Sequence, residues 1–193
     1  QQANVESAIG LTNNTKTITD AINGAQIASE GGTNTAMGLW YAWAALRPDG
    51  KSVFTGTSKA TDENNHPTSF DEVKNFQNTK VLVLLTDGVN EYVNLDKDST
   101  EFLSGADKTG LQPDLAANTR LNDMCSQIKS QSILLCTILY DIPPGTPSKP
   151  SPAEDQLTNC ATAGCSYIAV DQKSLQQAFD EIANRLIDKT ITQ

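Results

Sequence analysis

Two continuous apolar runs are the strongest pattern in this sequence. Residues 80–86 have the sequence KVLVLLT and residues 133–140 the sequence ILLCTILY, and both are rich in aliphatic side chains. Neither run alternates with polar residues, which is typical of parallel strands covered on both faces. A shorter run at residues 167–170 predicts a third strand.

Apolar residues at helical spacing predict helices before, between and after these strands. A first helix follows the polar residues 12–14, which offer it an N-cap. A second, apolar on nearly every face over residues 37–46, is predicted to be well buried and to end before Pro48. A third spans residues 115–128, and a last one begins at Ser174, the first position of a capping-box pattern.

The alternation of helices and strands indicates an α/β fold, with a Rossmann-like, mostly parallel sheet covered by helices on both faces. The length of 193 residues suits a single domain over residues 1–193. Three irregular stretches, rich in Gly, Pro, Asn, Asp, Ser and Thr, are predicted as surface insertions. They lie at about residues 49–79, 89–113 and 141–156, and prolines stiffen the last of them.

The net charge excludes one class of partner. With 23 acidic and 14 basic side chains the chain carries a formal charge of -9, so it would repel the phosphates of a nucleic acid. Its apolar runs are far shorter than the ~20 residues that cross a bilayer. No basic region followed by an apolar region opens the sequence, so we expect any signal or membrane anchor to lie upstream.

Four cysteines bear on the compartment and on stability. Cys125, Cys136, Cys160 and Cys165 lack the paired spacing of a zinc site, and are either buried free thiols in a reducing compartment or disulfides in an oxidising one. The polar, Asn- and Thr-rich composition favours the second interpretation and an extracytoplasmic location. We predict a Cys125–Cys160 disulfide, because Cys125 faces the sheet beside an apolar stripe and Cys160 follows the Pro-rich stretch. A second pair, Cys136–Cys165, competes with an unpaired buried thiol at Cys136.

Asp87 is the most informative polar residue. It follows the apolar strand at 80–86 and thus lies at the carboxyl edge of the sheet, where open α/β folds bind their ligands. The alternative is a turn cap, with Gly88 adopting a positive φ. Thr33 and Thr35 begin the second predicted helix, where a hydroxyl is either an N-cap or a ligand. With Asp87 they form the oxygen-only donor set that suits Mg²⁺, Mn²⁺ or Ca²⁺.

The order of three motifs resembles a known family. GGTNTAMGL, an apolar strand ending in LLTDG, and a helix leading into ILLCTILYD are together similar to the von Willebrand factor A (vWA) domain. The details are more similar to the C-terminal region of TadG-like proteins of bacterial tight-adherence pilus systems. The resemblance implies a metal-ion-dependent adhesion site in which Thr33 and Asp87 are metal ligands. It also implies a noncatalytic module for adhesion or pilus assembly that binds a protein or cell-surface ligand.

One part of the family pattern is absent. The DxSxS loop, which in the family follows the central strand, occurs nowhere in the 193 residues. The fold is therefore expected to lack its N-terminal strands here, with upstream residues or another chain supplying them. Because Asp87 and one or two hydroxyls provide little charge, we expect this chain alone to bind a divalent cation weakly or not at all.

Two other functions compete with this hypothesis. A metal-free vWA-like scaffold would keep Thr33 and Asp87 as remnants and bind partners through its insertions. A Rossmann-like hydrolase would use Asp87 as a catalytic carboxylate, but no nucleophile and base pair accompanies it. The acidic stretch around Asp96 and Asp98 imitates a calcium loop without its glycine, and the single histidine, His66, lies in a polar stretch; both are interpreted as solvated surface.

Overall fold

A three-stranded parallel sheet forms the centre of the protein. The structure is a computed structural model, and it describes residues 9–12, 14–25, 34–47, 70, 79–87, 113–141, 145 and 150–191. The strands are β1 (Val81–Thr86), β2 (Leu134–Tyr140) and β3 (Ser166–Ala169), in the spatial order β1-β2-β3. The predicted α/β fold with a parallel sheet is confirmed, and all three predicted strands form to within a residue or so.

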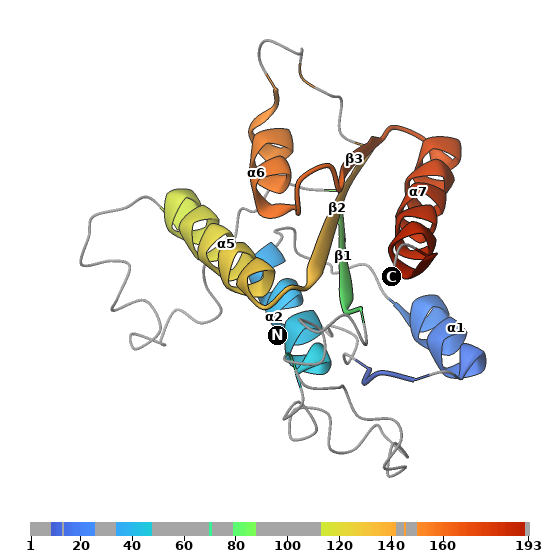
Figure 1. The fold of residues 1–193 in the computed structure, drawn as a ribbon. Helices are drawn as coiled ribbons and strands as arrows, with labels where there is room; N and C mark the ends of the chain where they lie inside the picture. Colours follow the sequence, from blue (N-terminus) through green and yellow to red (C-terminus); the bar gives the residue numbers. More distant parts are fainter. Residues whose placement is uncertain are drawn as a thin grey trace.

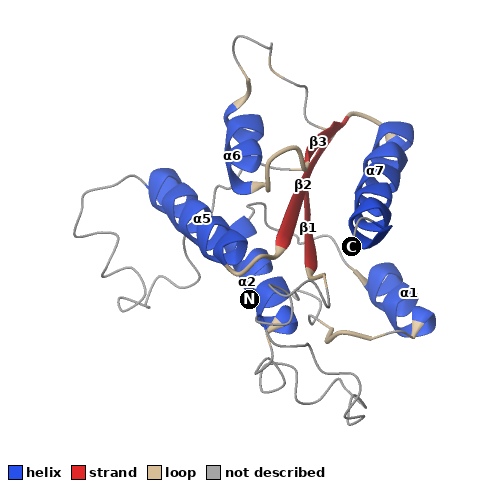
Figure 2. Ribbon diagram, in the orientation of Figure 1, coloured by secondary structure: helices blue, strands red, loops and turns tan. Residues whose placement is uncertain are grey.

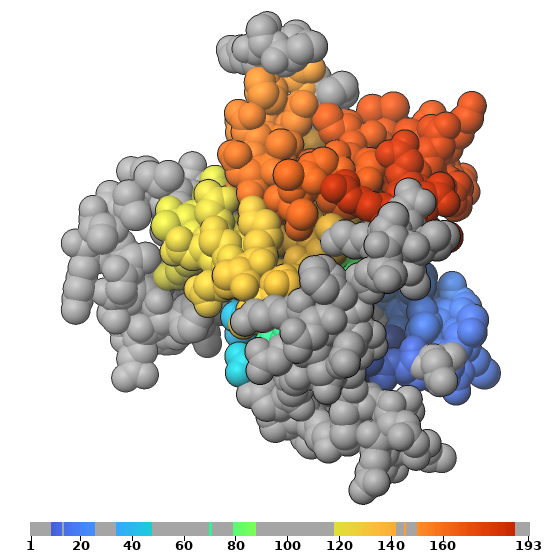
Figure 3. Space-filling model, in the orientation of Figure 1, coloured from blue at the N-terminus to red at the C-terminus, as the bar shows by residue number. Residues whose placement is uncertain are grey.

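Helices cover both faces of this sheet, as predicted. α2 (Thr35–Leu46), α5 (Pro113–Ser130) and α6 (Pro152–Cys160) lie on one side, and α1 (Thr15–Gly24) and α7 (Gln172–Ile191) lie on the other (Figures 1 and 2). Figure 3 shows α5 and α6 forming one continuous surface, consistent with the packing of these two helices against each other. The sheet is therefore the middle of three layers.

The sheet separates the apolar core into two parts, one under α2 and α5 and the other under α7. Leu82 pairs with Leu135, and both belong to an apolar cluster with residues of α2 and α5 such as Leu39 and Leu121. On the other side, β2 contributes Leu134, Cys136 and Ile138 to a cluster with α7. Beneath α6, a third cluster joins Leu139, Ala153 and Leu157. The first six of the seven residues of β2 are buried, as expected for the central strand of the described sheet.

β1 is covered unevenly. Its residues Val83 and Leu85 pair in register with Cys136 and Ile138, which are fully buried under α7. Val83 and Leu85 are nevertheless 37% and 46% exposed, because α7 packs over β3 and β2. An apolar strip of β1 therefore faces outward on the α7 side.

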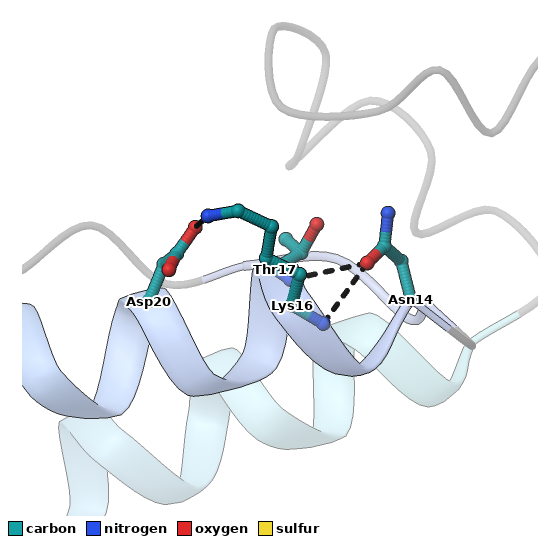
Figure 4. Close-up of polar contacts among 4 residues, drawn as sticks. All are labelled: Asn14, Lys16, Thr17 and Asp20. Atoms are coloured by element: carbon teal, nitrogen blue, oxygen red, sulfur yellow. Dashed lines mark hydrogen bonds and ion pairs between the residues drawn. The ribbon is translucent and has the colours of Figure 1, made fainter.

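α1 is held by its own polar contacts. Asn14 is its N-cap, as the polar cluster predicts, and its side-chain oxygen accepts hydrogen bonds from the backbone N–H groups of Lys16 and Thr17 (Figure 4). One turn later, Lys16 forms a 2.6 Å ion pair with Asp20. No residue of α1 is buried, and Ile22 is 69% exposed, so the apolar stripe of this helix has no tight packing among the described residues.

α2 is less buried than predicted. Leu39 and Ala44 face the core, but Trp40 and Tyr41 are each 40% exposed and contact each other edge to face. The helix rests on the sheet by one side, so burial of that side suffices to hold it. Its N-cap is Asn34, whose side chain accepts a hydrogen bond from Met37 N–H, rather than either neighbouring threonine.

The boundaries of α6 and α7 also differ from the predictions. The irregular stretch expected to reach about residue 156 ends earlier, because Ser151 and Glu154 form a reciprocal capping box that starts α6 at Pro152. Proline is compatible with this first turn, where its missing N–H is not needed. α7 begins at Gln172, so placing its cap at Ser174 was wrong by three residues.

Candidate functional site at the carboxyl edge of the sheet

Asp87 lies at the position that the sequence predicts, directly after β1. Thr86, the last strand residue, is buried, whereas Asp87 is exposed. Thr86 is in register with Leu139, so the carboxylate emerges at the carboxyl edge beside the end of β2. This edge is where parallel α/β sheets collect ligands.

The start of α2 lies toward the same edge. The Lys80 ammonium, just before β1, donates a 2.5 Å hydrogen bond to the carbonyl of Leu46, the last residue of α2. α2 also packs against β1, and its 12 residues and the 6 residues of β1 each span about 20 Å. The helix therefore runs back along the strand, and its first residues, Asn34 and Thr35, come to the level of the carboxyl end.

This direction matters for the electrostatics of the edge. The amino end of a helix carries a partial positive charge, which favours nearby carboxylates and anions. The other end of α2 has the opposite polarity and lies near the Lys80 ammonium. Asp87 and Lys80 are thus placed at the ends of the helix that suit their charges.

Thr33, the second predicted ligand, lies outside the described residues. Its proximity to Asp87 therefore stays a prediction. The described residues that follow Thr33 in the sequence are the N-cap Asn34, which is half-buried, and Thr35, which is buried. Asp96, Asp98 and His66 also lie outside the described part of the chain.

An aspartate follows every described strand at this edge, whereas only Asp87 was predicted to be a site residue. Asp141 comes directly after β2 and Asp171 two residues after β3, and both are exposed. Asp141 adopts a φ of 56°, a left-handed conformation that aspartate tolerates, and its N–H donates to the Ala169 carbonyl at 2.8 Å. The signal was present: each apolar run in the sequence is followed within two residues by an aspartate.

Asp171 is committed to a structural role. Its carboxylate accepts hydrogen bonds from the hydroxyl and the N–H of Ser174 at 2.6 and 2.7 Å, and the Ser174 hydroxyl in turn accepts one from Asp171 N–H. The side-chain hydrogen bond is the largest cause that lowers the pKa of Asp171, followed by the Ser174 backbone N–H. Asp171 is thus the N-cap of α7, and Ser174 is the third residue of its first turn.

These aspartates do not form a ready-made metal centre. Among the residues that the structure describes, no three His, Cys, Asp or Glu side chains converge on one point where a metal ion could be held. A metal ion bound by Asp87 therefore receives a single carboxylate from this edge and requires further ligands.

The opposite, amino edge of the sheet is cross-linked. Both predicted cysteine pairs are bonded: Cys125–Cys160 joins α5 to α6, and Cys136–Cys165 joins β2 to the residue before β3, with Cα–Cα distances of 5.1 and 4.7 Å. All four cysteines are buried, and because Cys136 is bonded to Cys165 the alternative of an unpaired buried thiol at Cys136 is wrong.

Residues 160–165 form a loop between one cysteine of each disulfide, and side chains from two helices hold this loop by hydrogen bonds. Lys129 of α5 donates to the carbonyl of Ala161 at 3.3 Å, and Arg185 of α7 donates to the carbonyls of Ala163 and Gly164. Thr162 completes the brace through two hydrogen bonds to the backbone of Leu135. The amino edge is structural, which leaves the carboxyl edge as the candidate binding edge.

The chain matches no protein-family model, and comparison with curated proteins and with solved structures finds no match. None of the described helices is long and apolar enough to cross a membrane.

Proposed function

We propose that this chain is part of a noncatalytic vWA-like module that binds a protein or cell-surface ligand through a divalent cation. The observation that carries the proposal is the exposed carboxylate of Asp87 at the carboxyl end of an apolar parallel strand, toward which the start of α2 points. The resemblance of the GGTNTAMGL and LLTDG motifs to those of vWA domains and TadG-like proteins supports a proposed role in adhesion or pilus assembly.

The ligand chemistry of the proposed site is simple. Asp87 supplies the one charged ligand and Thr33 a neutral hydroxyl, and both are the oxygen donors that Mg²⁺, Mn²⁺ and Ca²⁺ prefer. A cation bound by so few charges stays electrophilic, so the carboxylate of a partner protein completes its coordination. In this proposal Asp87 anchors the ion and does not itself react.

The remaining ligands come, in this proposal, from a DxSxS segment on a further strand beside β1. The open edge of β1 supports a strand at that place, because among the described strands β1 pairs with β2 alone. The sequence of β1, VLVLLT, contains no charged residue and no proline. Natural edge strands instead carry charges, prolines or bulges that discourage further pairing.

We also propose an extracytoplasmic location. Two disulfides between fully buried cysteines support it, because such bonds form and persist in oxidising compartments. The acidic charge of -9 is consistent with a partner other than a nucleic acid.

A metal-free vWA-like scaffold is the second candidate. It is favoured by the absence of a three-ligand cluster among the described residues and by the commitment of Asp171 to helix capping. In that case binding would use surfaces other than the carboxyl edge.

Manganese titration separates the two candidates. We expect weak Mn²⁺ binding by the present chain, detected by electron paramagnetic resonance, and tighter binding by a longer chain that contains the proposed DxSxS segment. Asp87→Asn should abolish the gain, whereas Asp141→Asn, which alters an exposed aspartate after the neighbouring strand, should preserve it. Equal loss in both variants, or no gain on extension, would favour the metal-free scaffold.

A further inference from the structure

The two disulfides connect the cysteines in an interleaved order. Along the chain the order is Cys125, Cys136, Cys160, Cys165, and the bonds join the first to the third and the second to the fourth. Four cysteines allow three complete pairings, and this one contains no bond between cysteines that are neighbours in the sequence. All three pairs of neighbouring cysteines are closer in the sequence than either native pair, and none of them is bonded in the folded protein.

The closer partnerships are favoured in an unfolded chain. Cys160 and Cys165 are five positions apart, whereas the native partner of Cys160 is 35 positions away. The entropic cost of closing a flexible loop grows with the logarithm of its length, so Cys160 meets Cys165 about 20-fold more often than it meets Cys125. Gly164 lies within the short loop and eases its closure.

The native fold excludes the Cys160–Cys165 bond. Cys160 lies in the apolar cluster of α2 and α5, and Cys165 lies in the cluster under α7, on the other face of the sheet. Thr162, between them, is hydrogen-bonded to both the N–H and the carbonyl of Leu135. A chain that first oxidises to Cys160–Cys165 must break this bond before the two clusters can form.

The rearrangement must also come early. All four cysteines are buried in the folded protein, with exposed fractions of 0–1%. A thiolate can attack a disulfide only where it has access to one of the sulfurs. A non-native cysteine pairing can therefore be corrected only before the core forms and buries the four cysteines.

We propose that this chain is a folding substrate of a thiol–disulfide isomerase, a protein whose cysteine thiolate attacks exposed disulfides. Oxidation of the four thiols by two equivalents of a protein or small-molecule disulfide, each of which is reduced to two thiols, first gives Cys125–Cys136 and Cys160–Cys165. The isomerase thiolate then attacks Cys160, which forms a mixed disulfide and releases the Cys165 thiolate. This inference does not depend on the proposed metal site.

Two further exchanges complete the rearrangement. The Cys165 thiolate attacks Cys136, which forms the native Cys136–Cys165 bond and releases the Cys125 thiolate. Cys125 then attacks Cys160 in the mixed disulfide, which forms Cys125–Cys160 and returns the isomerase thiolate. The number of disulfides is the same before and after, so these steps need no oxidant and the isomerase is a true catalyst.

Oxidation in denaturant tests the first half of the proposal without requiring a fold. The reduced 193-residue chain is oxidised by glutathione disulfide in guanidinium chloride, quenched with acid and mapped as non-reduced peptides. We expect Cys160–Cys165 to exceed Cys125–Cys160 by about 20-fold. Equal or greater amounts of the native pair would overturn the proposal.

Refolding tests the second half. The oxidised, mispaired chain is transferred to native buffer with a catalytic amount of purified isomerase, and native pairs are followed by peptide mapping. We expect their appearance to accelerate from hours to minutes, and an isomerase lacking its nucleophilic cysteine to have no effect. Rapid native pairing without isomerase would contradict the proposal.

A matched variant isolates the effect of connectivity. Cys136→Ala/Cys165→Ala keeps the native Cys125–Cys160 pair and removes its short-range competitor. Oxidation of this variant should be independent of isomerase. If the isomerase accelerates it as much as it accelerates the natural chain, the enzyme acts on something other than pairing and the proposal fails.

Discussion

The side chain of Lys80 caps the end of α2 through its hydrogen bond to the Leu46 carbonyl. The same ammonium lies 4.4 Å from the centroid of the Phe70 ring. Lys80 is buried, so its charge is removed from water and is stabilised by the carbonyl, the ring and the negative end of the helix. This contact fixes the direction in which α2 runs along β1.

Replacing Lys80 by methionine is expected to destabilise the protein by about 1–3 kcal/mol. The change keeps most of the apolar stem but leaves the Leu46 carbonyl without its donor. Urea denaturation followed by circular dichroism measures the loss. Lys16→Met is the control, because the exposed ion pair of Lys16 contributes at most about 0.5 kcal/mol. Equal losses in the two variants would contradict the role of Lys80.

Asp87→Ala distinguishes a ligand from a turn cap. If Asp87 is reserved for a ligand, as we propose, removing its exposed carboxylate should change the free energy of unfolding by less than about 0.5 kcal/mol. If it caps the following turn, the loss should be about 1 kcal/mol. Thermal denaturation in the presence of a metal chelator measures the difference.

Asp171 should contribute to acid denaturation. Its pKa in the folded protein is lower than the ordinary value of 3.8, so its contribution to stability is present above that value and is lost as the pH falls through the lower, folded pKa. Ser174→Ala removes the largest cause of the shift and should raise the pKa toward 3.8. Carboxyl titration by nuclear magnetic resonance reads this directly, with the unsubstituted chain as the reference. An unchanged Asp171 titration would show that the hydrogen bond from Ser174 is not the cause.

The two disulfides should stabilise the fold by similar amounts. They span 35 and 29 residues, and for both loops the chain-entropy estimate is about 4 kcal/mol. Unfolding free energies of Cys125→Ala/Cys160→Ala and Cys136→Ala/Cys165→Ala, measured in urea, should therefore fall to a comparable extent. A loss below about 1 kcal/mol in either variant would show that its bond does little to restrict the unfolded chain.

Protein recovered from its native compartment should contain both disulfides. Alkylation of the lysate with a thiol reagent before purification, followed by non-reducing peptide mapping, preserves the original state. Four alkylated cysteines would remove the main support for an extracytoplasmic location.

The sequence predicted the sheet well because its signal is local. β2 is buried on both faces and β1 mainly on one face, but the sequence of each is an unbroken apolar run, and this run identifies both as strands. Helix starts were harder, since Asp171 and Ser174 are both good capping residues and only their reciprocal hydrogen bonds show which one is the cap.

The candidate site was predictable only in part. Asp87 could be placed because it directly follows a strong strand signal, and parallel strands end at one edge. The second cysteine pair remained open, because Cys136 in an apolar strand has the same local pattern whether or not it is bonded; its partner is decided by the register of β2 with β3. The exposure of Trp40 depended on which side of α2 meets the sheet, and an all-apolar helix does not specify that side.

The tryptophans of this protein are both in α2. Trp40 is partly exposed, while the indole N–H of Trp43 donates a 2.8 Å hydrogen bond to Gln131, in the turn after α5. Intrinsic tryptophan fluorescence therefore reports on a single helix, with one emitter in contact with solvent and one tied to the neighbouring helix. A spectral change on adding a cation or a partner would locate the event at α2, the helix that begins beside Thr33.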